Sequence, residues 1–319
     1  MKNIDSDIMV SVNCLVYNHA PYLRQCLEGF IMQKTSFRFE VILHDDVSTD
    51  GSVEIIKEYA EKYPDIIKPI YEKENQYSKK DGSIARIMIN NMSGKYVAMC
   101  EGDDYWIDPL KLQKQFDMME KHPEIDMCTH ATYFEDAVSG MRCGENFHGK
   151  DVCVLSTQDV ILEEGGFITT SSIFYRNTLN QKIPAFREFM DYDYPLQIQG
   201  SLRGGILYLP DYMSVYHQGV PGSFCNREKT IEEKVDYIHN KEHLLSLLDE
   251  ETNHLYHNTI IARFLLYEVT SQNNQIKNIR ILWKYRKGWP KLDCKKKINI
   301  IRKCICPQFI LLYNRYFRK

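Results

Sequence analysis

Residues 96–106 read YVAMCEGDDYW, a short apolar run that turns abruptly into acidic residues and a glycine. A short apolar run bounded by turn residues is typical of a buried strand, here Tyr96 to Cys100. Two adjacent carboxylates, Asp103 and Asp104, therefore follow the end of that strand. Because neighbouring carboxylates repel each other, they are favourable mainly beside a cation, and oxygen ligands select Mg²⁺ or Mn²⁺.

Two earlier segments have the same form. Residues 9–17, MVSVNCLVY, are followed by Asn18, and residues 39–43, FEVIL, are followed by HDD, which ends at Asp46. Apolar residues at helical spacing come after each run, and strands that alternate with such helices predict an α/β fold with a mostly parallel, doubly wound sheet. Ligands of these sheets bind beyond the carboxyl ends of the strands. We expect that rim to carry Tyr17, Asn18, Asp46, Asp103 and Asp104.

The pattern changes along the rest of the chain. We expect further strands at Met127–Tyr133, at Ile168–Tyr175, which is rich in Thr, Ser and Ile, and at Met213–Tyr216, directly before His217. From about Glu228 the strand signals fade and apolar residues recur at helical spacing, which predicts a helical C-terminal extension.

Four segments together resemble the family 2 glycosyltransferases. They are VSVNCLVYNHAPYLRQCL (10–27), FEVILHDDVSTDGS (39–52), GKYVAMCEGDDYW (94–106) and, less closely, FMDYDYPLQIQGSLRGGILYLPDYMSVYH (189–217). The resemblance implies the GT-A fold, with a nucleotide-binding half at 1–105 and an acceptor half at 106–226 inside a domain of 1–226. Residues 227–319 then form the helical C-terminal region.

The resemblance also implies roles on the donor side. Asp46 would read the base of a nucleotide donor by accepting its ring N–H, and Asp104 would hold Mn²⁺ or Mg²⁺. Asp103 would lie against the donor's ribose and diphosphate, or on the metal, and Tyr17 and Asn18 would line the donor site. His217 is either a further metal ligand or a structural histidine. The family more often has Gly where Val47 stands and an apolar residue in place of the preceding histidine at position 44.

The same resemblance places the general base at the start of a helix in the acceptor half. Asp193 is the candidate, and Asp191 is the alternative. The implied reaction is inverting transfer of a sugar from a nucleotide diphosphate donor, by default a UDP-sugar, to a saccharide acceptor. A carboxylate there would take the acceptor hydroxyl's proton as that oxygen attacks.

Other readings of the same residues stay open. Asp45 and Asp46 could cap the next helix, and the two later pairs could be turn or helix-entry acids. The protein could be a degenerate, non-catalytic relative that binds carbohydrate or nucleotide. A sugar-phosphate nucleotidyltransferase is disfavoured because residues 18–21, NHAP, lack a glycine-rich phosphate loop, and a dehydrogenase is disfavoured because no G-x-G-x-x-G motif follows the first strand.

Charge is uneven along the chain. Residues 277–319 carry 14 Lys and Arg against one acid, whereas residues 1–276 have a net charge of −16. Aromatic residues interleave with the basic ones, a composition suited to an anionic membrane surface and to a lipid-linked, for example polyprenyl-linked, acceptor in cell-surface polysaccharide synthesis. A nucleic-acid partner is disfavoured because the acidic part would repel it.

The remaining composition suggests a compartment. No apolar run reaches the roughly 20 residues of a membrane-spanning helix. The ten cysteines lack C-x-x-C spacing, which favours reduced thiols. We expect a cytoplasmic protein that can lie on the inner face of the cell membrane.

Overall fold

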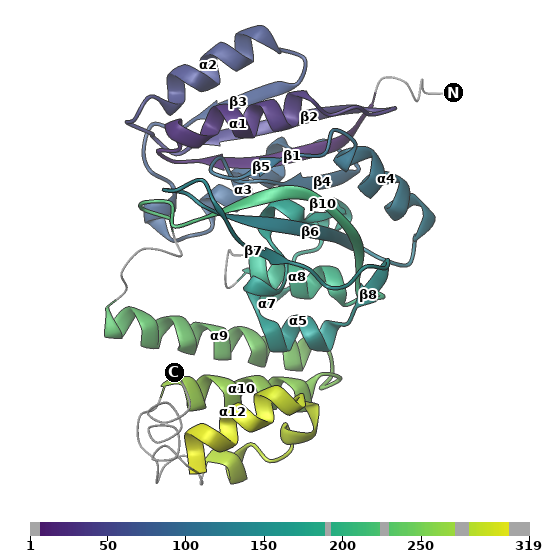
Figure 1. Cartoon of the computed structure of the whole chain (residues 1–319), viewed down its shortest axis with the longest axis vertical. Helices are drawn as coiled ribbons and strands as arrows, with labels where there is room; N and C mark the ends of the chain where they lie inside the picture. Colours follow the sequence, from purple (N-terminus) through teal and green to yellow (C-terminus); the bar gives the residue numbers. More distant parts are fainter. Residues whose placement is uncertain (1–6, 189–192, 224–229, 272–280, 306–319) are drawn as a thin grey trace. The chain divides into compact units, whose positions relative to one another are not determined.

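The computed structural model describes residues 7–188, 193–223, 230–271 and 281–305 (Figure 1). The chain divides into two compact units. Unit 1 comprises Met1–Val160 and Glu164–Glu228, and unit 2 comprises Ile161–Glu163 and Lys229–Lys319.

Unit 1 is built on one ten-stranded sheet. Its main path runs through β3 (Ile67–Tyr71), β2 (Arg38–Asp45), β1 (Ile8–Val16), β4 (Tyr96–Met99), β9 (Phe174–Arg176), β6 (Met127–Asp136), β10 (Ile206–Gln218) and β5 (Tyr105–Trp106). Off this path, β7 (Arg142–Asn146) pairs with β6, and β8 (Cys153–Leu155) pairs with β10. The first four strands are mutually parallel, β6 is parallel to β10, and β9 is antiparallel to both of its neighbours. The predicted mostly parallel α/β sheet is therefore confirmed.

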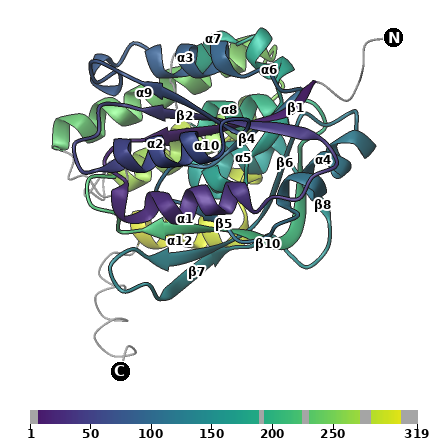
Figure 2. The ribbon, with the colours of Figure 1, turned by 90° about the horizontal axis from the view of Figure 1, so that it is seen from above.

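Helices cover both faces of this sheet. The helical elements of unit 1 are α1 (Ala20–Ile31), α2 (Ser52–Lys62), η2 (Tyr77–Lys79), α3 (Ser83–Asn91), α4 (Lys111–Lys121), α5 (Thr157–Glu163, which continues into unit 2), η3 (Gly165–Phe167), η4 (Thr170–Ser172), α6 (Thr178–Gln181), α7 (Ala185–Glu188) and α8 (Asp193–Ser201). Helices α1, α2 and α4 contribute to the main core together with alternate residues of β1, whereas α3 lies on the opposite side of the sheet from α1 and α2 (Figure 2).

The alternation of side chains between the two faces of β1 explains which of its residues belong to this core. Val10, Val12, Cys14 and Val16 are buried and belong to one apolar cluster with Leu27 of α1. Successive strand residues point to opposite faces, so a run of nine strand residues places every second side chain against the same helices.

The segment predicted as a strand at Ile168–Tyr175 is different. It contains a 3₁₀ turn, η4, and only the first two residues of a short strand, β9. The Ser172 hydroxyl and the Ser172 N–H both donate to the carbonyl of Thr169, at 2.7 and 3.0 Å. Side chains of Ser and Thr compete in this way for backbone groups that a strand would use, which explains the wrong prediction.

Unit 2 is helical where it is described. It contains α9 (Ile231–Glu251), α10 (His257–Ser271), η5 (Trp289–Lys291) and α12 (Cys294–Ile305). Its apolar cluster consists of Leu162, Ala262, Leu265, Val269, Ile281, Tyr285, Leu292 and Ile300. Part of the basic C-terminal stretch thus belongs to this core. Each helix in the described part of the chain is too short or too polar to span a lipid bilayer.

Candidate functional site

The ends of β1, β2 and β4 meet at one edge of the sheet. Val16 pairs with Asp45, and Asn13 pairs with Met99, so the three strands end close to the same level. After β4 the chain stays bound to β1, because the N–H of Gly102 donates to the carbonyl of Leu15 at 2.9 Å. The predicted convergence of the strand ends is present in the structure.

Gly102 is needed for this close approach. A Cβ atom built there would lie 2.9 Å from His19 Nδ1 and 2.9 Å from Val16 Cγ2. Real side chains do not come so close, so glycine lets the acidic loop press against the end of β1.

The loops after β1 and β2 are tied together by short polar side chains. Asn18 is left-handed (φ 56°), its N–H donates to the Ser48 hydroxyl at 2.9 Å, and its side-chain oxygen accepts from the Thr49 N–H at 2.8 Å. The Ala20 N–H donates to Asp50 at 2.9 Å. Asn18 therefore orders the rim, and Tyr17 beside it is half exposed (51%) and free to meet a ligand.

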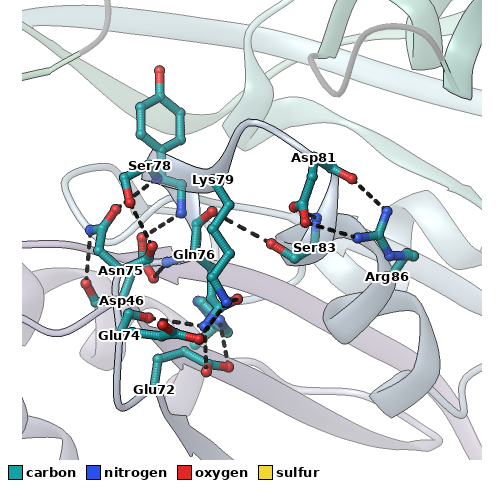
Figure 3. A network of polar contacts seen from close by, with 12 residues as sticks. Asp46, Glu72, Glu74, Asn75, Gln76, Ser78, Lys79, Asp81, Ser83 and Arg86 are labelled. Atoms are coloured by element: carbon teal, nitrogen blue, oxygen red, sulfur yellow. Dashed lines mark hydrogen bonds and ion pairs between the residues drawn. The ribbon is translucent and has the colours of Figure 1, made fainter.

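Asp46 organises a third loop (Figure 3). Its Oδ1 accepts from the Gln76 N–H at 2.6 Å, and its Oδ2 accepts from the Tyr77 N–H at 3.0 Å. The Asn75 amide donates to the Asp46 carbonyl at 3.1 Å. The buried carboxylate of Asp46 thus fixes the start of η2 against the rim, and each of its oxygens keeps a lone pair for a further donor.

Val47 has an unusual backbone conformation beside it. Its φ is 68°, in the left-handed region that a β-branched residue rarely occupies. Glycine would adopt this φ without strain, so a valine here indicates that the neighbouring Asp45–Asp46 turn is held in place by its surroundings.

Asp104 connects the loop after β4 to β10. Its Oδ1 accepts from the His217 N–H at 2.9 Å, whereas its Oδ2 is buried and has no hydrogen-bond partner among the described residues. Burial, followed by the charge of Asp103, raises the pKa of Asp104 well above its usual range. An isolated carboxylate in this position is costly, and a cation would relieve that cost.

His217 is held by both ring nitrogens. Nδ1 lies within hydrogen-bond distance of the Asp103 carbonyl, and Nε2 lies 3.3 Å from Glu135 Oε1. The Tyr105 hydroxyl donates to the same Glu135 carboxylate at 3.3 Å. His217 can offer Nε2 to a ligand only by leaving Glu135.

The acids of this rim extend to Glu101 and Asp193. His19 Nε2 lies 3.8 Å from Asp103 Oδ2, and burial lowers the pKa of His19 despite that neighbour. Burial and then the charges of Asp103 and Asp193 raise the pKa of Glu101 well above its usual range. Glu101 and Asp193, which are far apart in the sequence, therefore interact electrostatically in the fold.

Asp193 begins α8 and accepts a hydrogen bond from the Thr170 hydroxyl of η4. Its charge also contributes, after burial and Asp103, to the raised pKa of Glu101, so Asp193 lies on the Glu101 side of the rim. Asp191, the alternative base, lies outside the described residues.

Known proteins resemble this chain in sequence and in fold. A family model described as glycosyl transferase family 2 matches residues 11–183, more than half of the chain. The chain belongs to this family. An uncharacterized protein of Mycobacterium tuberculosis is 34% identical to this glycosyltransferase over 251 residues, which cover 72% of this chain and 69% of the relative.

A further relative in sequence and one solved structure are also similar to this chain. An uncharacterized glycosyltransferase of Nostoc sp. is 28% identical over 186 residues, 54% of this chain and 52% of its own. The crystal structure of S. aureus TarS 1-349 in complex with UDP-GlcNAc superposes with a TM-score of 0.60 and 16% identity, covering 93% of this chain and 82% of TarS 1-349. The likeness to TarS shows the fold, and the predicted GT-A architecture is confirmed.

The rim of this glycosyltransferase fits a hard divalent cation. The Oδ2 of Asp104, which lacks a hydrogen-bond partner in the described part of the chain, supplies one oxygen, and Asp103, the preceding residue, contributes a second carboxylate. Carboxylate oxygens suit Mg²⁺ and Mn²⁺, and the positive charge would offset the burial and the repulsion from Asp103 that together raise the pKa of Asp104.

Reasoning from sequence missed several residues of this rim. Glu135, at the end of β6, and His19, after β1, contact His217 and Asp103 respectively, but neither was assigned a role. Thr170 was assigned to a strand, and its contact with Asp193 was not foreseen. The position of Glu135 near the carboxyl end of an expected strand was the one signal available.

Proposed function

We propose that this glycosyltransferase transfers a sugar from a UDP-sugar to a saccharide acceptor with inversion, using Mn²⁺ or Mg²⁺ at Asp104 and Asp103. The buried Oδ2 of Asp104, for which the described residues offer no hydrogen-bond partner, carries this proposal. A bound cation would stabilise the charge that develops on the diphosphate as it leaves. UDP is favoured because the TarS structure that shares the fold was determined with UDP-GlcNAc.

The protein's own groups have distinct tasks in this proposal. Asp46, fixed by two backbone N–H groups, keeps lone pairs for a base N–H, while Tyr17 and Asn18 border the same edge. Asp193, with Thr170 on one oxygen, takes the proton of the acceptor hydroxyl as that hydroxyl attacks the donor sugar. His217 positions Asp104 through its backbone N–H, and its ring is an additional candidate ligand.

The acceptor class and the location rest on the C-terminal stretch. We propose a polyprenyl-linked or similar lipid-linked saccharide acceptor, met at the inner face of the cell membrane. Trp283 is 70% exposed with the Arg286 guanidinium 4.2 Å from its ring centre, and Lys287 near it is exposed. Exposed aromatic and basic side chains together favour an anionic lipid surface. The aromatic residues at 309–317 lie outside the described residues.

Calorimetry of nucleotide binding tests the donor site without the acceptor. The protein is titrated with UDP, GDP, CDP and dTDP, each with and without Mn²⁺. We expect binding of UDP that requires Mn²⁺, and Asp104→Asn should weaken that binding by at least about tenfold because one charged ligand is lost. Asp65→Asn, an exposed acid between α2 and β3, is the matched control and should change nothing.

Each other outcome has a meaning. Binding of UDP that is equal with and without Mn²⁺ would remove the metal from the donor site. Preference for another nucleotide would correct the donor class. Absence of binding by all four nucleotides would favour the degenerate, non-catalytic alternative.

A further inference from the structure

The turn between α9 and α10 of unit 2 gathers an acid and two histidines. Helix α9 ends at Glu251 and α10 begins at His257, with Asn253 and His254 both left-handed (φ 49° and 63°) between them. The His254 N–H donates to the Asp249 carbonyl at 2.8 Å. This tight reversal brings the His254 side chain back over the last turn of α9.

The three side chains converge on one oxygen. His254 Nδ1 lies 3.0 Å and His257 Nδ1 lies 2.7 Å from Asp249 Oδ2, and the three potential ligand atoms all lie within 4.8 Å of one another. The Asp249 side chain is 13% exposed, whereas those of His254 and His257 are 67% and 44% exposed. A largely buried carboxylate thus lies beneath two imidazoles that are open to solvent.

A second observation comes from the other carboxylate oxygen. Asp249 Oδ1 is buried and has no hydrogen-bond partner among the described residues. The two histidines therefore satisfy only one of the two oxygens, and hydrogen bonding within the turn leaves the other without compensation. Asp249 Oδ1 therefore has lone pairs that no proton of the cluster occupies.

The distances suit a metal ion with little movement. Zn–N and Zn–O bonds of about 2.0–2.2 Å in a tetrahedral site place ligand atoms roughly 3.3 Å apart. The two separations from Asp249 Oδ2, 2.7 and 3.0 Å, would have to open by only a few tenths of an ångström, and the two imidazole nitrogens lie no more than 4.8 Å apart. Two imidazoles and one carboxylate form an N₂O set that suits Zn²⁺, with the fourth position left to water.

Unit 2 would gain from such a link. Its described apolar cluster is small, and the turn joins the two long helices α9 and α10 at a point where two residues adopt a left-handed conformation. Small units with limited cores are commonly stabilised by a metal. We propose that Asp249, His254 and His257 form a Zn²⁺ site that fastens the α9–α10 turn, separate from the donor site.

Zinc titration of the full-length protein tests the site. Protein stripped with a chelator and dialysed is titrated with ZnCl₂ in a calorimeter, and thermal unfolding is followed with and without saturating zinc. His254→Asn is the most informative variant, because asparagine tolerates the left-handed backbone and the side chain is largely exposed. His257→Gln removes the second imidazole, and His239→Asn, an exposed histidine of α9, is the matched control.

We expect wild-type protein and His239→Asn to bind zinc with equal affinity. His254→Asn and His257→Gln should bind zinc at least about tenfold more weakly, or not at all. Zinc should raise the midpoint of thermal unfolding of wild-type protein and of the control, but not of His254→Asn. The site should persist in Asp104→Asn, which separates it from any zinc bound at the donor site. Zinc binding that is equal in wild type and both ligand variants, or absent from wild type, would overturn the proposal.

Discussion

At the scale of single residues, the rim collects more negative charge than the protein alone can stabilise. The pKa values of Asp104 and Glu101 are both raised, with burial as the first cause and neighbouring acids as the second. Groups with shifted pKa values commonly lie in active sites, where a positively charged ligand stabilises the ionised carboxylates. In the proposed function, the cation that accompanies the donor diphosphate would supply the positive charge beside these acids.

Asp193→Asn should separate binding from chemistry. The variant keeps the hydrogen bond from Thr170 but loses the basic oxygen, so UDP affinity should be unchanged while turnover falls by about 10²–10⁴. Release of UDP from a UDP-sugar, with water or an added saccharide as acceptor, measures turnover. Asp65→Asn is the control, and Asp191→Asn is compared in parallel. Full activity in Asp193→Asn with loss in Asp191→Asn would transfer the role to Asp191.

Lys111 gives a separate prediction about stability. It is fully buried at the start of α4, its Nζ lies 2.7 Å from Gln115 Oε1 and 4.1 Å from the centre of the Trp106 ring, and burial lowers its pKa to about 7. In the unfolded chain the pKa returns to 10.5. Between pH 7 and 10 the unfolded chain therefore binds more protons, and the free energy of unfolding should rise with pH.

Replacing Lys111 with Met removes that dependence. From pH 7 to pH 9, wild-type protein should gain about 2 kcal/mol relative to Lys111→Met. Urea unfolding at several pH values measures the difference, and Lys121→Met, an exposed lysine at the end of the same helix, should behave like wild type. If the free energy of unfolding changes with pH equally in wild type and in Lys111→Met, the lowered pKa of Lys111 is contradicted.

Local sequence predicted the acids of the rim better than their partners. The change from apolar residues to Asp103–Asp104 lies within a few positions, so it marks a strand end directly. The contact between His217 and Glu135 joins residues 82 positions apart and depends on the pairing of β10 with β6, which no local pattern encodes. Asp46 was predicted to read a base, and its two bonds to the loop at 76–77 were not predicted.

At the scale of elements, the strands β1, β2 and β4 follow from apolar runs, whereas the irregular segment before β9 does not. The hydroxyl side chains there can form hydrogen bonds with nearby backbone groups or with distant residues. Strand propensity does not decide between these two kinds of partner. In the fold, the Thr132 hydroxyl meets that of Thr169 at 2.8 Å. That contact needs β6 in place, so a strand was a reasonable but wrong prediction.

The packing of α1 on β5 depends on Gly29. A Cβ atom at position 29 would lie 2.9 Å from the backbone nitrogen of Trp106 and 3.0 Å from its carbonyl oxygen. Gly29→Ala should therefore push α1 away from β5. Overpacking of this kind costs about 1–3 kcal/mol, more than alanine gains in helix propensity. Urea unfolding should show the loss. Gly166→Ala, where a Cβ would meet open space, is the control, and equal stability of the two variants would refute the close contact.

At the scale of the whole molecule, charge is divided along the chain, with −16 on residues 1–276 and +13 on residues 277–319. Deleting the basic stretch is a poor test of its role, because Tyr285, Leu292 and Ile300 belong to the core of unit 2. Substitution of exposed residues avoids this problem. Trp283 and Lys287 are both exposed and lie outside that apolar cluster.

The double variant Trp283→Ser, Lys287→Glu should bind anionic vesicles more weakly than wild type. Replacing one basic residue at a membrane surface costs about 1 kcal/mol, and reversing its charge and removing the indole should together weaken binding by about tenfold or more. Sedimentation with phosphatidylserine–phosphatidylcholine vesicles measures the effect, with pure phosphatidylcholine as the neutral surface. Lys57→Glu, an exposed lysine of α2, controls for net charge. If wild type fails to sediment with anionic vesicles, or the double variant sediments as wild type does, the described part of the basic stretch does not bind membranes, and the acceptor must be brought to the enzyme by other residues.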